Sequence, residues 1–120
     1  MVYGDAHVFG CACVHGGAQV YGDAQVYGFN TLVAGNAHVY GRALVLGNSK
    51  VYGHANVSER AWIFGDAQVH GDTDVKGNVI VTRDANLYTG SFQGTMCVYG
   101  KNAPFLHILF YKFLALLKTV

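Results

Sequence analysis

Val20-Tyr21-Gly22-Asp23-Ala24-Gln25 decides the fold, because most of the chain repeats this stretch with small changes. Each unit reads as an aliphatic residue, any residue, glycine, any residue, a small residue and any residue. The aliphatic position recurs every six residues, except for a seven-residue step between Val26 and Val33. It is occupied by Val2, Val8, Val14, Val20, Val26, Val33, Val39, Val45, Val51, Val57, Ile63, Val69, Val75, Val81 and Leu87. A short and faithful repeat of this kind indicates a solenoid of stacked units.

The small position lies two residues before each aliphatic residue and holds alanine in most units. Because side chains alternate along a strand, we expect Ala24 and Val26 to point inward and Gln25 outward. The glycine two places after the aliphatic residue can take a positive φ angle, which suits a bend at each corner. Other residues replace this glycine at Glu59, Arg83 and Thr89. Mild backbone strain is expected at the first two of these positions.

Three units close a triangular coil, and coils stack by parallel hydrogen bonding at about 4.8 Å. The interior of such a coil is narrow, which explains the preference for valine and alanine. The repeat therefore predicts an all-β parallel β-helix of about five coils over residues 1–100. The regular pattern weakens after Leu87, where Thr89–Gly94 does not fit, and Val98-Tyr99-Gly100 recovers one unit.

The motif Val-Tyr-Gly-Asp-Ala-Gln and its variants resemble the repeats of the hexapeptide-repeat proteins, over residues 2–91. The resemblance implies a left-handed parallel β-helix. The family includes acyltransferases and γ-class carbonic anhydrases, which are commonly trimeric. The form of the repeat with glycine two places after the aliphatic residue also resembles the repeats of uncharacterised bacterial and phage proteins that are labelled transferases. Such a resemblance is specific for the fold and much less so for activity.

Length and composition limit the number of domains and the kinds of partner that the protein can have. A chain of 120 residues has room for one domain, and a net charge of +1 gives no reason to expect a nucleic-acid partner. The three cysteines do not form a disulfide framework, so reduced thiols in a cytoplasmic protein are expected. No signal peptide is expected before Val2, because the repeat starts at once.

One predicted face carries large apolar side chains at outward positions. These residues are Leu44, Leu46, Trp62, Phe64 and Ile80. Outward side chains of a solenoid are usually polar unless something covers them. The stripe therefore predicts an interface, either with another subunit or with another part of the chain.

The composition changes at Asn102-Ala103-Pro104, and residues 101–120 are predicted to form a C-terminal amphipathic helix. Residues 105–120 are too short for an ordinary transmembrane span and carry Lys112 and Lys118. Contact of this helix with a membrane surface is one reading. The favoured reading is a helix packed along the apolar face, and a tail unrelated to the repeat stays open as a third.

The resemblance to acyltransferases implies a histidine general base in a cleft between subunits. His38 is the candidate, because it lies just beyond the only interruption of the regular repeat before Leu87, a single residue near Phe29. No substrate-binding loop is visible in the sequence. His38 is therefore the single catalytic candidate of this alternative.

The resemblance to carbonic anhydrases implies a histidine triad around zinc. His15 and His70 share a predicted outward column but lie three coils apart, roughly 14 Å. No two histidines of one subunit are expected to share a metal, so no metal site is predicted. Asp66 and Asp84 stack at one corner, where two carboxylates could hold a cation. Aspartate at such corners chiefly reflects turn preference.

The leading prediction is a structural or assembly module with no catalytic site and no cofactor. We expect a homo-oligomer, either a trimer or an end-to-end assembly. An acyltransferase with an active site between subunits is the first alternative, and a zinc protein resembling γ-class carbonic anhydrases is the second. The substrate, the oligomeric state and whether the chain is part of a longer protein stay open.

Overall fold

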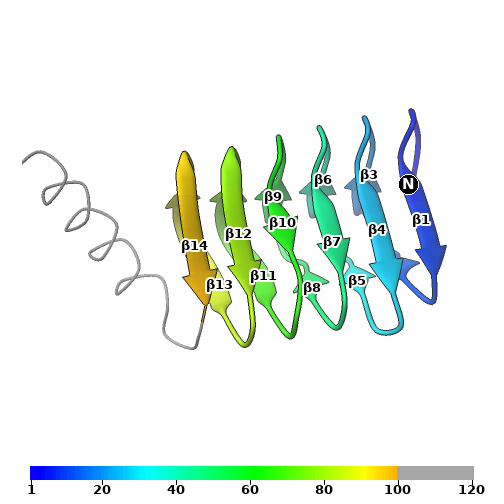
Figure 1. The fold of residues 1–120 in the computed structure, drawn as a ribbon. Helices are drawn as coiled ribbons and strands as arrows, with labels where there is room; N and C mark the ends of the chain where they lie inside the picture. Colours follow the sequence, from blue (N-terminus) through cyan, green and yellow to red (C-terminus); the bar gives the residue numbers. More distant parts are fainter. Residues whose placement is uncertain (100–120) are drawn as a thin grey trace, which may run out of the picture.

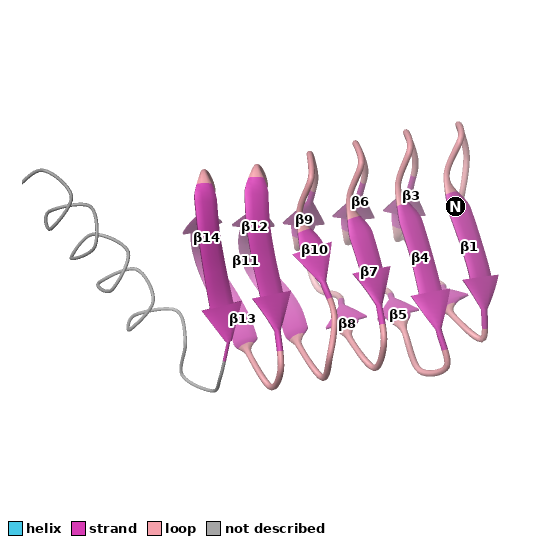
Figure 2. Ribbon diagram, in the orientation of Figure 1, coloured by secondary structure: helices cyan, strands magenta, loops and turns pink. Residues whose placement is uncertain are grey.

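The protein is a parallel β-solenoid of about five coils, as the repeat predicts (Figure 1). The structure is a computed structural model, and it describes residues 1–99. Each coil contributes three short strands that lie beside the equivalent strands of the next coil. Figure 2 shows that the described part consists of strands and connecting loops.

The first side of the solenoid, face A, is a six-stranded sheet in the order β1-β4-β7-β10-β12-β14. Its strands are β1 (His7–Gly10), β4 (Gln25–Gly28), β7 (Leu44–Leu46), β10 (Trp62–Ile63), β12 (Asn78–Thr82) and β14 (Thr95–Tyr99). All neighbouring strands in this sheet are parallel.

The second sheet folds around a corner and supplies the other two sides. Face B comprises β2 (Cys13–Val14), β5 (Leu32–Val33), β8 (Lys50–Val51) and the first half of β11 (Gln68–Val75). Face C comprises β3 (Gln19–Val20), β6 (His38–Val39), β9 (Asn56–Val57) and the second half of β11. β13 (Asn86–Phe92) pairs with β11 along both halves.

The core consists of the inward alanine and valine residues of the repeat. Val45 has 0% exposure and lies in register with Val26 above it and Ile63 below it. Backbone N–H groups of one coil donate to carbonyl oxygens of the next, as in Gln19 N to Ala37 O at 2.9 Å. The predicted inward register of the repeat is confirmed.

Buried hydroxyl groups replace alanine at some inward positions without leaving unpaired polar atoms. The Ser49 Oγ donates to the Leu46 carbonyl at 2.7 Å, and the Thr73 Oγ1 donates to the His70 carbonyl at 2.8 Å. Every buried side-chain nitrogen or oxygen in residues 1–99 has a hydrogen-bond partner. These hydroxyls donate hydrogen bonds to backbone carbonyl groups at the preceding corner, and the bonds fix the corner against the core.

The corners show the strain that the sequence predicts. Glu59 and Arg83 have φ angles of 61° and 59°, the left-handed region that glycine occupies at the equivalent corners. A side chain there crowds the backbone, which glycine avoids. The prediction of left-handed backbone at both positions is confirmed.

The solenoid continues through the segment where the sequence pattern weakens. Ile80 pairs with Cys97, seventeen residues later, whereas Trp62 pairs with Ile80 after eighteen. The register of β11 with β13 shifts between Val69 and Asp72, which absorbs the missing residue. Phe92, with 0% exposure, takes the inward position below Val75.

The expected fold, a solenoid with a C-terminal helix packed along one face, is corrected to an all-β solenoid. The chain over residues 1–99 holds strands and loops and no helix. Residues 105–120, on which the helix prediction depended, lie outside the described residues. The prediction rested on the apolar periodicity of that segment, on its start at Asn102-Ala103-Pro104 and on the outward apolar stripe, and none of these specifies what a segment packs against.

Candidate functional site

Face A brings the five predicted interface residues together. Leu44, Trp62 and Ile80 lie directly beside one another in register on β7, β10 and β12. Leu46 and Phe64 follow the inward residues of their own units and are half-buried. Trp62 has an exposed fraction of 46%, which is high for a large apolar side chain. The five residues therefore form one apolar patch, named here the face A patch.

Aromatic residues extend the face A patch toward the first coil. Phe9 and Tyr27 stack with ring centroids 4.6 Å apart and an angle of 9° between their planes. Tyr27 lies in register with Leu46. Phe9 is 49% exposed. The apolar surface of this face is thus longer than the stripe predicted from the sequence.

A shallow hollow of about 240 Å³ lies beside the indole of Trp62. Arg60, Trp62, Asn78 and Ile80 line it. The hollow is small for an organic ligand, since ligand pockets usually measure about 300 Å³ or more. It is large enough to receive one side chain of another molecule.

His38 lies on β6 in face C, away from the face A patch. Its neighbours in register are Gln19 and Asn56. The ring of Tyr21 meets it edge-on, with centroids 6.2 Å apart. Asn56 is occupied by a hydrogen bond to Asp74 at 3.0 Å. The structure therefore gives His38 polar and aromatic neighbours but no carboxylate in direct register to orient it as a general base.

His15 and His70 share one outward column but lie three coils apart. In the outward column of face B, Ala34 and Tyr52 lie on the two coils between His15 and His70. His70 stacks on Tyr52 at 4.6 Å, and its Nε2 lies 2.7 Å from the Oδ1 of Asn86. No group of three or more His, Cys, Asp or Glu within residues 1–99 has the geometry to hold a metal ion.

A tyrosine ladder runs along the edge of face C. Tyr3 and Tyr40 stack on opposite sides of Tyr21, each with centroids 5.0 Å from it. Burial raises the pKa of Tyr21, and the neighbouring Tyr40 and Tyr3 raise the pKa further. Each inner ring face is covered by the next ring, so the ladder stabilises the stack of coils.

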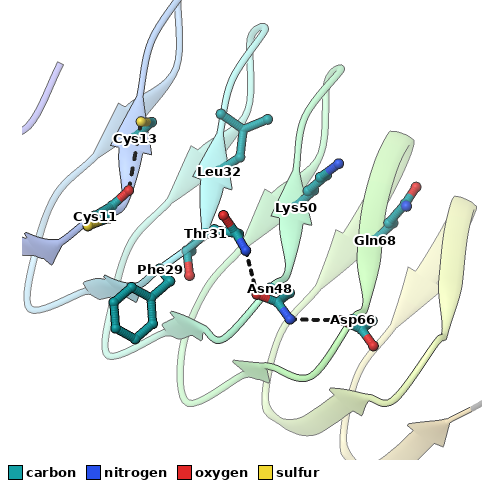
Figure 3. A pocket seen from close by; sticks show the side chains of 10 residues that line it. Cys11, Cys13, Phe29, Thr31, Leu32, Asn48, Lys50, Asp66 and Gln68 are labelled. Carbon is teal, nitrogen blue, oxygen red and sulfur yellow. Dashed lines mark hydrogen bonds between the residues drawn. The ribbon is translucent and has the colours of Figure 1, made fainter.

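A groove at the corner before face B was not predicted from the sequence. It encloses about 580 Å³ and is open to solvent (Figure 3). Its lining residues come from the corner before face B and from the first outward column of that face. Phe29 projects beside it and is 83% exposed. The sequence signal for this groove was the single seven-residue step, which inserts Phe29 at the corner.

Side-chain amides form a ladder along this corner. The Nδ2 of Asn30 donates to the Oδ1 of Asn48 at 3.1 Å, and the Nδ2 of Asn48 donates to the Oδ1 of Asp66 at 3.1 Å. Figure 3 shows both hydrogen bonds. Asp66, considered above as half of a cation site with Asp84, is thus the acceptor at the end of an amide ladder.

No known protein family, curated protein or solved structure matches the chain. Among residues 1–99 there is no helix of the length and apolarity that a membrane crossing needs.

Proposed function

We propose that this chain is an assembly module of the hexapeptide-repeat type that associates with copies of itself through the face A patch. The main observation that supports this proposal is that Leu44, Trp62 and Ile80 lie in register on three adjacent strands of face A. Apolar side chains in consecutive strands make a continuous surface rather than scattered exposed residues. Burial of such a surface is the main driving force for association.

The polar composition of face C supports face A as the association surface. The outward column of face C in register is Gln19, His38, Asn56 and Asp74. Polar side chains of this kind interact well with water and gain little from burial. Burial of face A would therefore gain more free energy than burial of this polar column of face C.

A second copy of the chain suits the shape of face A. Six parallel strands at about 4.8 Å span roughly 24 Å, and two such sheets pack about 10 Å apart. Most soluble oligomers are symmetric and use the same patch on each subunit. Burial of Trp62 and Phe64 would contribute a few kcal/mol at about 25 cal/mol per Å².

Light scattering of the full-length protein tests the proposal. The wild type should show a mass that is a multiple of one chain, and Trp62→Glu should shift the mass to one chain. Leu44→Glu, a change in the same row, should do the same. Tyr88→Glu is the matched control, because Tyr88 is 53% exposed and lies on β13 outside face A.

Trp62 is the only tryptophan, so its fluorescence reports on the same surface. Association should shift the emission to the blue and protect it from a soluble quencher, and dilution should reverse both effects. A wild-type protein of single-chain mass over the micromolar range refutes the proposal. So does an unchanged mass in both glutamate variants.

A further inference from the structure

We propose that the corner groove beside face B binds an extended neutral oligosaccharide, with Phe29 as the stacking platform. The groove lies on different residues from the face A patch, so this inference stands apart from the assembly proposal. An exposed ring, an amide ladder and a net charge close to zero in the groove support this inference.

Phe29 is an unusual residue in this solenoid. Its side chain is 83% exposed, and among residues 1–99 its ring stacks on no other ring, unlike Phe9 or Tyr21. A large apolar ring exposed to water gains free energy when a ligand covers its face. The ring is therefore accessible to a ligand, and Figure 3 shows Phe29 among the side chains that line the groove.

The corner that carries Phe29 is held in place by a buried hydroxyl. The Oγ1 of Thr31 lies 2.6 Å from the Tyr27 carbonyl oxygen, which precedes the insertion, and 2.8 Å from the Gly47 carbonyl oxygen on the next coil, so these two acceptors share its one hydroxyl proton. Thr31 itself is 1% exposed. Because buried Thr31 fixes the corner that carries Phe29, the backbone of this corner loses little conformational freedom when a ligand binds.

The rest of the groove offers hydrogen-bonding groups at regular intervals. Successive coils contribute one corner residue and one face B residue each. These pairs are Asn30 with Leu32, Asn48 with Lys50, and Asp66 with Gln68. Each amide has two N–H donors and an oxygen with two lone pairs, and the ladder uses only part of this capacity. The remaining donors and acceptors suit the hydroxyl groups of a sugar chain.

Charge and shape disfavour strongly charged ligands and compact ligands. Lys50 and Asp66 are the charged side chains that line the groove, so its net charge is close to zero. A strongly anionic or cationic ligand therefore gains no overall attraction. An open groove along the coils suits a long ligand better than a compact one, which usually needs an enclosed pocket. A glycan combines neutral charge, hydroxyl groups, apolar ring faces and an extended repeating form.

The test is an NMR titration of the full-length protein with cellohexaose, chitohexaose and maltohexaose. At least one should shift amide signals of residues 29–32 and 48–50 at millimolar concentration. Phe29→Ala should weaken this binding at least tenfold, whereas Phe29→Tyr should retain it because a phenol ring also stacks on a sugar. Tyr88→Ala is the matched control: it removes another exposed aromatic of face B and should leave the affinity unchanged.

Two results overturn the proposal. One is the absence of shifts with all three hexasaccharides, and the other is equal affinity in the wild type and Phe29→Ala. If no sugar binds and Phe29→Ala instead lowers the mass seen in light scattering, the groove is a contact between copies of the chain. Because Phe29 is exposed, its substitutions should leave the circular dichroism spectrum and the melting temperature unchanged, which confirms that each variant is folded.

Discussion

Phe92→Ala should loosen the fifth coil while the middle coils stay intact. Phe92 has 0% exposure and is the largest of the fully buried side chains in the described part of the chain. It fills the inward position opposite Val75, where the coil is one residue shorter than its neighbours. Removing a buried phenylalanine ring typically costs about 3–5 kcal/mol, from lost burial and from the cavity that remains.

The loss should be local, because each coil of a solenoid contacts only its neighbours. Hydrogen exchange measured by mass spectrometry checks this. A cost of about 3 kcal/mol corresponds to more than a hundredfold rise in the opening equilibrium of the amides in β13 and β14. Amides of β4 and β5 should exchange at nearly the wild-type rate.

Tyr88→Ala is the control within the same strand, because this side chain is 53% exposed and leaves no cavity when it is shortened. Its effect on exchange should be below about 1 kcal/mol. An equally small effect of Phe92→Ala would refute the reasoning, since the ring would then not hold the fifth coil. Uniform acceleration in all coils would instead refute the local coupling.

Further predictions concern the core, the corners and the tyrosine ladder. Val45→Asp should lower the free energy of unfolding by several kcal/mol in urea denaturation, because Val45 is fully buried and the carboxylate would have no partner. Glu59→Gly should be neutral or stabilising by up to about 1 kcal/mol, because Glu59 has a φ angle of 61°; a loss of about 2 kcal/mol would show an unidentified role. Thr31→Val should cost about 1–2 kcal/mol by removing the hydroxyl that bonds to two carbonyls at 2.6 and 2.8 Å, and a neutral result in the same assay would contradict this. Tyr21 should ionise above the ordinary tyrosine pKa in an ultraviolet titration; because its folded-state pKa is raised, the stability it contributes is present below the unfolded pKa and is lost as the pH rises through the folded pKa.

The repeat by itself determined the path of the backbone in this protein. Inward alanine and valine at fixed spacing, such as Ala24, Val26 and Val45, permit one register only, because a shift by one residue would turn the core outward. The same spacing predicted the left-handed backbone at Glu59 and Arg83. Local sequence suffices for these features because each coil repeats the same contacts with its neighbours.

The fifth coil and the corner groove were decided by the tertiary structure. Phe92 is buried because the bulge in β11, between Val69 and Asp72, shifts the register of β13 by one residue, and the local pattern does not show that shift. The amides of Asn30 and Asn48 meet because stacking brings together residues eighteen positions apart. The exposure of Phe29 likewise follows from how its corner sits on the next coil. Side-chain contacts between coils depend on three-dimensional stacking, so sequence alone places these residues but does not show what they form.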